Sequence, residues 1–304
     1  MKKQLILICA LSMLTLATSA QKVYKLAKNS GKLSLNISGA IVEGYNGSEI
    51  IFTIPKSDGD HTDERAKGLM PMNSSGFKDN TGIGLDIAVK GDEIIVNPVS
   101  VSNQAMVSIK LPQNIKLSFV NNNITYQDTL TVKNIKTEID VSVTGNDVIL
   151  VNNVGPMNIK TLHGSVDATF SGEIKGPISI VSVHGHVDVA LPVAVKANLD
   201  VVSNYGKIYA AEGLKIAVNP VVRTERAPAG TSISIATSGA KKGSPLTMTL
   251  NASPAASPNT ISTVTSAAGF STRRDSETLN GKINGGGIDI LLKSNSDNVY
   301  IRQK

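Results

Sequence analysis

The chain has 304 residues, of which 41% are hydrophobic and 18% charged, with a formal net charge of +6 and no tryptophan. This length allows one large domain or two small ones. A modest positive charge spread over such a chain gives little reason to expect nucleic-acid binding, and we expect none. Asn, Ser, Thr, Gly and Val are abundant and helical periodicity is hard to find, which is typical of an all-β protein.

The first twenty residues, 1–20, have the pattern of a secretory signal peptide. Two lysines precede an apolar run from Leu5 to Leu16, and small residues stand before Gln21. This run is too short for a membrane span. Cleavage after Ala20 would remove Cys9, the one cysteine, so no intrachain disulfide is expected. No later apolar run approaches the roughly 18 residues of a membrane helix. We therefore expect export to the periplasm, the outer surface or the extracellular space.

The mature chain begins with alternating apolar and polar residues over 33–38, 40–45 and 49–55, which predict strands. Residues 56–82 are polar and glycine-rich and predict a long inserted loop. Four apolar side chains in it suggest that part of the loop packs back onto the core: Leu69, Met70, Met72 and Phe77. The strand pattern resumes after this loop.

Residues 155–210 repeat one pattern three times with a spacing of 21. A ring-bearing residue precedes a glycine in each repeat, as in His163-Gly164, His184-Gly185 and Tyr205-Gly206. Apolar and Ser/Thr positions also recur at this spacing, including these columns: Met157, Ile178 and Leu199; Ile159, Ile180 and Val201; Thr161, Ser182 and Ser203; Val166, Val187 and Ile208. The alternation within each repeat predicts strands with one buried face.

Two local structures fit this repeat. His-Gly could close a two-residue hairpin between two strands, with the glycine in a left-handed conformation. Alternatively, each repeat is one coil of a single-stranded β-helix, or β-solenoid, with like columns stacked on neighbouring coils. The pairs Gly155-Pro156 and Gly176-Pro177 are also 21 residues apart. Hairpins have no reason to keep this period in both the glycines and the Gly-Pro pairs. The sequence therefore favours a β-solenoid with coils of about 21 residues.

After Leu214 the regularity fails. Residues 223–278 are rich in Ser, Thr, Ala, Pro and Gly and predict a second insertion of low order. The pattern returns in the last residues, where Ile288, Ile290 and Leu292 are aligned with Met157, Ile159 and Thr161. Ser296-Asp297 takes the place of His-Gly. We interpret this segment as a charged terminal coil of a single domain, 21–304.

Several segments, taken in order, resemble the putative-adhesin family of secreted proteins common in Bacteroidetes: IVEGYNGSEIIF, RAKGLMPMN, DNTGIGL, LPQNIKL, GPMNIKTLHGSVDATF, GHVDVALP and LNGKINGGGIDILL with NVYIRQK. The resemblance covers most of 30–212 and 279–304. It implies a β-solenoid, right-handed by the same analogy, and an adhesin-like role. It brings no catalytic residues with it, and the insertion at 223–278 departs from the family's compact pattern.

The weak candidates for a metal site are His163, His184, His186, Asp167 and Asp188. Stacked coils would place like residues above one another, and imidazole or carboxylate groups so placed could bind zinc, copper or calcium. The same positions also fit turn and outward-facing residues in solvent, and Tyr205 and Tyr209 replace the third histidine and aspartate. We expect no metal, no cofactor and no catalytic residue.

The sequence therefore predicts an exported, non-enzymatic envelope or surface protein that serves as a binding scaffold for glycan, protein or matrix. One alternative is a carbohydrate-active β-helix enzyme, a lyase or hydrolase. Two aspartates could reach the separation that glycosidases require, but Asp167 and Asp188 have no matching basic column, and the chain has no tryptophan. A second alternative is a structural or regulatory envelope module.

Overall fold

The computed structural model describes residues 21–55, 64–100, 106–219 and 276–304, and these form an all-β structure. Two mixed sheets contain the described strands, and two single-turn 3-10 helices, η1 (Glu64–Ala66) and η2 (Glu212–Leu214), lie outside the sheets. Within the described residues, no helix is long and apolar enough to cross a membrane. All the described strands belong to one compact unit.

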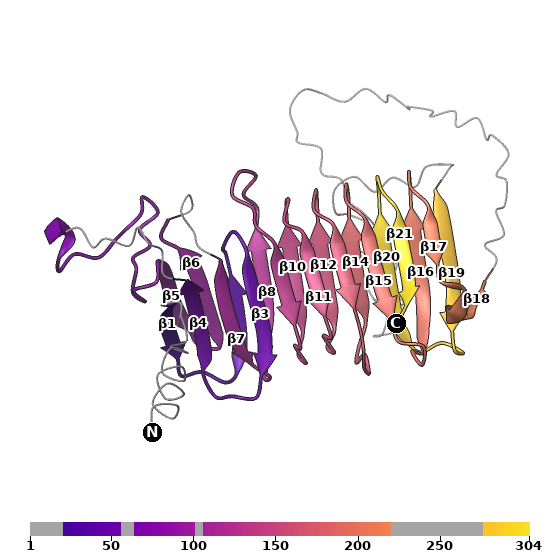
Figure 1. The fold of residues 1–304 in the computed structure, drawn as a ribbon, viewed down its shortest axis with the longest axis horizontal. Helices are drawn as coiled ribbons and strands as arrows, with labels where there is room; N and C mark the ends of the chain where they lie inside the picture. The colour runs from indigo at the N-terminus through magenta and orange to yellow at the C-terminus, as the bar shows by residue number, and fades with distance from the viewer. Residues whose placement is uncertain (1–20, 56–63, 101–105, 220–275) are drawn as a thin grey trace, which may run out of the picture. The chain divides into compact units, whose positions relative to one another are not determined.

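The strands of each sheet lie in a row (Figure 1). Sheet A consists, in spatial order, of β1 (Gln21–Leu26), β4 (Ile50–Pro55), β7 (Val107–Pro112), β3 (Ala40–Tyr45), β9 (Leu130–Lys133), β11 (Val148–Val151), β13 (Val166–Thr169), β15 (Val187–Leu191), β21 (Val299–Gln303) and β17 (Ile208–Ala210). Sheet B consists of β18 (Ile216–Val218), β19 (Glu277–Ile283), β16 (Ala197–Ser203), β20 (Ile288–Ser294), β14 (Ile178–Ser182), β12 (Met157–Thr161), β10 (Ile139–Val143), β8 (Ile115–Asn121), β2 (Gly31–Leu35), β6 (Glu93–Pro98) and β5 (Leu85–Lys90).

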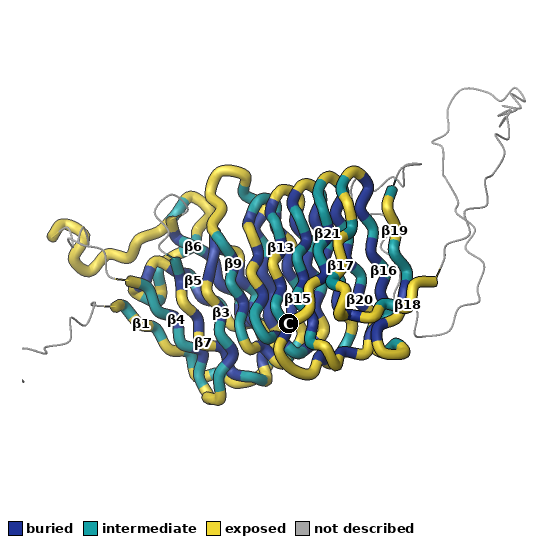
Figure 2. The backbone as a smooth tube through the Cα atoms, turned by 45° about the vertical axis from the view of Figure 1, so that its right-hand side comes forward, coloured by how far each residue is buried: buried dark blue, intermediate teal, exposed yellow. Residues whose placement is uncertain are grey.

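From β8 to β17 the chain alternates between the two sheets, and each strand pairs in parallel with its neighbours, except that β16 pairs antiparallel with β19. Met157 lies opposite Ile178, and Val166 opposite Val187, so residues 21 apart share a column. The inward side chains of both sheets form one buried core. Figure 2 colours the buried residues dark blue along the backbone. The antiparallel pairs lie at the ends of the sheets. The predicted columns are therefore confirmed. The alternative of a hairpin at His163-Gly164 is wrong, because the strands on either side belong to different sheets.

Near each end of the described chain, two strands lie between strands that are close to each other in sequence. Strand β20 lies between β14 and β16 in sheet B, and strand β21 lies between β15 and β17 in sheet A. Near the other end, β2 lies between β6 and β8, and β3 lies between β7 and β9. The interpretation of the last residues as a terminal coil is wrong. Their backbone donors and acceptors are paired on both sides, so this coil is internal to the stack.

The register of β20 also differs from the prediction by two residues. Ile290, and not Ile288, shares the column of Met157 and Ile178, and Ser294 shares that of Ser182. A shift of two residues keeps every side chain on the same face of a strand, so the apolar pattern cannot distinguish these registers. Val299, by contrast, lies opposite Val187, in the column of Val166.

A ladder of buried hydroxyls sets this register. In one coil, the Gly185 N–H donates to Ser182 Oγ at 2.9 Å, and Ser182 Oγ donates to the Gly164 carbonyl of the neighbouring coil at 2.9 Å. Ser294 repeats this arrangement, donating to the Gly185 carbonyl at 2.9 Å and accepting from the Asp297 N–H at 3.1 Å. The hydroxyl thus satisfies polar groups of two adjacent coils at once.

Close approach explains the glycines that follow these hydroxyls. A Cβ at Gly185 would collide with the carbonyl oxygen of Gly164. Gly164 and Gly185 are not among the residues with positive φ, so the expected left-handed conformation is wrong at both positions. Glycine is needed here because backbone passes directly over backbone.

Residues 64–82 of the first insertion project beyond the sheets (Figure 1). The side chains of Leu69, Met70 and Met72 are 71%, 62% and 61% exposed, so the expectation that they pack back onto the core is wrong; Phe77 is half-buried. The remainder of this insertion, the insertion predicted at 223–278 up to residue 275, and the signal peptide lie outside the described residues.

Candidate functional site

The turns between sheet B and sheet A carry the first pair of candidate histidines. The rings of His163 and His184 stack with centroids 4.8 Å apart and planes 9° from parallel. Ser296 continues the row, with its Oγ 3.3 Å from His184 Nδ1, and the Tyr205 N–H donates to the carbonyl of Asn295 at 3.1 Å. The predicted stacking of His163 on His184 is confirmed. Ser296 follows His184 in this row because the last coil lies between those of His184 and Tyr205.

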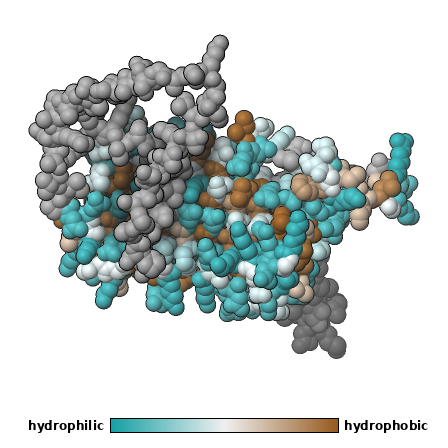
Figure 3. Space-filling model, turned by 180° about the vertical axis from the view of Figure 1, so that it is seen from behind, coloured by the Kyte–Doolittle hydropathy of each residue, from teal (hydrophilic) through white to brown (hydrophobic). Residues whose placement is uncertain are grey.

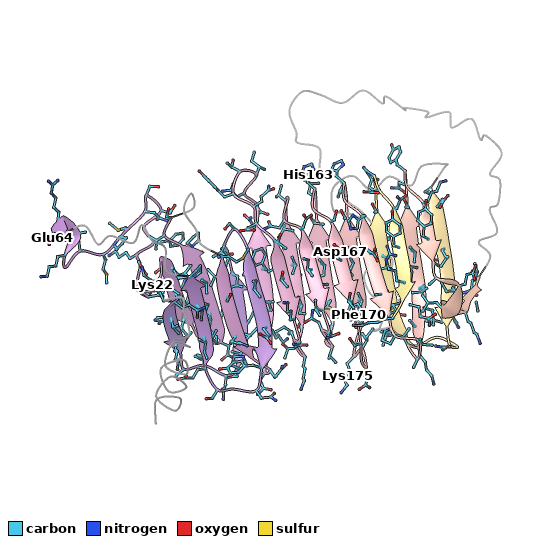
Figure 4. All side chains as sticks on the ribbon, viewed as in Figure 1. Lys22, Glu64, His163, Asp167, Phe170 and Lys175 are labelled. Atoms are coloured by element: carbon cyan, nitrogen blue, oxygen red, sulfur yellow. The ribbon has the colours of Figure 1, made fainter. Side chains whose placement is uncertain are left out.

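The other candidates lie on the outer face of sheet A. Asp167 on β13, Asp188 on β15, Tyr300 on β21 and Tyr209 on β17 form one column across four adjacent strands. Figure 4 shows Asp167 on the sheet and His163 at the turn edge, so the candidates divide between two places. We call the group on the sheet the Tyr300 cluster; it consists of Asp167, His186, Asp188, Tyr209, Tyr300 and Arg302.

Each aspartate of the Tyr300 cluster has a basic partner. His186 Nε2 lies 3.0 Å from Asp167 Oδ1. Arg302 Nε donates to Asp188 at 2.7 and 2.8 Å, and its Nη2 lies 2.7 Å from Asp188 Oδ2. The hydrogen bond to Asp188 and the charge of that carboxylate raise the pKa of the Arg302 guanidinium. The expectation that these aspartates lack basic partners is wrong, because Arg302 reaches Asp188 only through the internal position of β21.

Aromatic rings complete the cluster. Tyr209 and Tyr300 stack with centroids 5.3 Å apart and planes 10° from parallel. The Arg302 guanidinium lies 5.4 Å from the centroid of the Tyr300 ring, and His186 meets that ring edge-on at 6.3 Å. Asn298 Nδ2 donates to the Tyr300 hydroxyl at 3.0 Å. The repeat gave no sign of this aromatic pair, because Tyr300 comes from the coil assigned to the end.

The five metal candidates do not converge on one point. His163 and His184 stack at the turn edge, Asp167 pairs with His186, and Asp188 pairs with Arg302. Across the described ranges, no group of three or more His, Cys, Asp or Glu side chains could hold a metal ion. This arrangement offers paired charges and ring faces rather than a coordination shell.

The outer face of sheet A, where the Tyr300 cluster lies, is an open surface rather than a cleft. Two concavities of the described structure lie elsewhere, at turns, with volumes of about 300 and 600 Å³. The first is lined mainly by asparagines with Tyr126, and the second by Lys136, Lys175 and neighbouring polar residues. The view from behind is predominantly hydrophilic with scattered hydrophobic patches (Figure 3). The Tyr300 cluster lines neither concavity, so a ligand there would bind against a flat sheet.

Comparison with protein-family models and with curated protein sequences finds no match. Among solved structures, the chain is similar to a putative cell adhesion protein from Clostridium sporogenes ATCC 15579, with 12% identity and a TM-score of 0.42 over 94% of this chain and 99% of that one. It is also similar to a putative adhesin from Bacteroides fragilis NCTC 9343, with 9% identity and a TM-score of 0.38 over 94% of this chain and 98% of that one. Similarities this remote do not transfer a function.

Proposed function

We propose that the chain is an exported, non-enzymatic envelope or surface protein that acts as an adhesin-like binding scaffold for glycan, protein or matrix. Its architecture in this proposal is a single-domain β-solenoid, right-handed, with insertions at 56–82 and 223–278. The observation that carries the proposal is the Tyr300 cluster. It places tyrosine, arginine and paired carboxylates on the outer face of a sheet whose backbone is paired on both sides of β21.

The composition of the cluster supports binding. Tyrosine and arginine are the side chains that most often dominate the energy of recognition surfaces. The guanidinium of Arg302 is fixed by Asp188, and the ring of Tyr300 is fixed by Tyr209 and Asn298. Side chains that are already ordered lose little conformational entropy when a partner binds.

The same contacts argue against a glycosidase. A retaining or inverting enzyme needs one carboxylate free to attack or activate water and one able to give a proton. Asp188 accepts hydrogen bonds from two nitrogens of Arg302, and Asp167 Oδ1 lies 3.0 Å from His186 Nε2. The cluster thus engages both carboxylates with basic groups and places them on an open sheet.

Binding of the folded protein to purified envelope preparations tests the proposal, before and after protease or glycan-removing treatment. The wild type is compared with the double variant Tyr300→Ala, Arg302→Ala, with folding checked by circular dichroism. We expect the wild type to bind and the variant to bind more weakly. No binding by intact, folded wild type would contradict the scaffold. Turnover on a polysaccharide panel would support the lyase or hydrolase, and a deletion that alters envelope-stress sensitivity alone would support the structural module.

A further inference from the structure

We propose that the outer ring face of Tyr209 is a stacking platform for the apolar face of a pyranose in a glycan. The inference rests on the proposed function and names the ligand class and the contact residue. Tyr209 is 48% exposed and lies on β17, the last strand in the order of sheet A. It therefore stands at the end of the column that begins at Asp167.

The order of the stack leaves one face of Tyr209 open. One face of Tyr300 meets Tyr209. Arg302 reaches back to Asp188 on β15, so its guanidinium lies over the other face of Tyr300, away from β17. One face of Tyr209 is thus covered by Tyr300, and among the described strands none pairs with the far side of β17. The uncovered face is available to a flat, weakly apolar group.

The ring is held before any ligand arrives. Tyr209 stacks on Tyr300, whose hydroxyl accepts from Asn298, and the Lys207 N–H donates to Asn298 Oδ1 at 2.8 Å. A ring fixed in this way loses little rotamer freedom on binding, which favours a ligand whose affinity comes from many weak contacts.

The surroundings of Tyr209 are polar, which favours a sugar over an apolar protein side chain. Lys207, two residues before Tyr209 on the same face, is exposed, and Asn298 and the Tyr300 hydroxyl lie beside the ring stack. A pyranose presents an apolar face of C–H groups ringed by hydroxyls. An aromatic face with a few polar groups around it matches that pattern and fixes the orientation of the ligand.

Strand addition is the main competing use of this edge, and the structure disfavours it. Added strands bind through the free backbone groups of an edge. β17 spans only Ile208–Ala210, and the Ile208 N–H already donates to Glu277 Oε2 at 3.0 Å. An incoming strand would have to displace this carboxylate, whereas a sugar stacked on Tyr209 leaves it in place.

Calorimetric titration of the full chain with soluble oligosaccharides of glucose, galactose, mannose and N-acetylglucosamine tests the inference. We expect at least one of them to bind and Tyr209→Ala to weaken that binding about tenfold or more, as for a residue that dominates recognition. Tyr209→Phe keeps the ring and should keep the affinity. Tyr126→Ala, at an exposed tyrosine elsewhere (38% exposed), is the matched control and should bind like the wild type.

The inference is overturned if none of these oligosaccharides binds, or if Tyr209→Ala binds as tightly as the wild type. Tyr209→Leu supplies a second ring-free variant should the alanine variant fail to fold. Envelope binding measured in parallel separates the two proposals. Envelope binding by the wild type without any sugar binding leaves the scaffold standing and removes the pyranose site; a folded wild type that binds neither removes both proposals.

Discussion

At the scale of single residues, backbone contact between neighbouring coils decides which side chains are allowed. Gly185 lies against the Gly164 carbonyl, and the Ser182 hydroxyl joins the same two coils. The sequence displays both positions at a spacing of 21, so the repeat could be predicted. The reason for glycine could not be predicted, because a tight turn and a close approach of two backbone segments both require glycine.

Substituting Gly185→Ala should destabilise the protein by about 1–3 kcal/mol, the cost of forcing atoms into a filled space. The added Cβ would overlap the backbone of Gly164, which cannot move without disturbing the stack. Gly172→Ala is the control, because a Cβ there meets no atom within 4 Å. Urea denaturation measures both variants. Equal stability of the two would contradict the close approach of the coils.

Asp79 gives the loop before β5 a dependence on pH. Burial raises the pKa of this carboxyl, but hydrogen bonds from the Gly84 and Gly82 N–H groups and from the Thr81 hydroxyl and N–H outweigh it, so the pKa lies below its ordinary value of 3.8. A carboxyl whose pKa is lower in the folded state stabilises the fold above its unfolded pKa, and this stabilisation disappears as pH falls through the folded pKa.

Asp79→Asn should therefore be less stable than the wild type at neutral pH. The difference in their free energies of unfolding should narrow as the pH is lowered below about 4. The amide lacks the charge to which the four hydrogen bonds are donated. Urea unfolding midpoints of both proteins at about pH 7 and pH 3 provide the measurement. A difference in midpoint of the same size at both pH values would show that the ionised carboxyl of Asp79 is not the source of the stabilisation.

At the scale of elements, the order of strands in space departs from their order in the chain. The alternating pattern predicted most of the strands after residue 135, because each has one buried face. It could not place β20 and β21, because parallel strands of the same pattern can pair in any order and registers two residues apart bury the same face. Arg302 and Tyr300 consequently could not be assigned to the candidate site from the sequence.

Paired cysteines test the internal position of the last coil. In a Cys9→Ser background, His184→Cys with Ser296→Cys should form a disulfide on mild oxidation, because these side chains are in contact in adjacent coils. His184→Cys with Tyr205→Cys should not. One coil intervenes, which places these positions about two strand spacings, or ~10 Å, apart, beyond disulfide reach. Mass spectrometry of the oxidised variants distinguishes them. The opposite result would mean that the coils follow chain order.

At the scale of the whole molecule, one consequence of this strand order is the Tyr300 cluster, which we propose as a recognition surface. The last coil brings Tyr300 and Arg302 beside Asp188 and Tyr209, residues that are distant in sequence. The family resemblance predicted a binding role from segments that are mostly structural. The cluster that could carry this role depends on tertiary order, and a truncation that removes β20 and β21 would remove both the inner coil and two of the six residues of the cluster.

The most direct test of the scaffold is one screen that records binding and turnover together on glycans and polysaccharides, with and without calcium or zinc. We expect glycan binding without turnover, unchanged by either metal. Turnover on any polysaccharide would contradict a non-enzymatic scaffold and would make Asp167 and Asp188 the first residues to substitute.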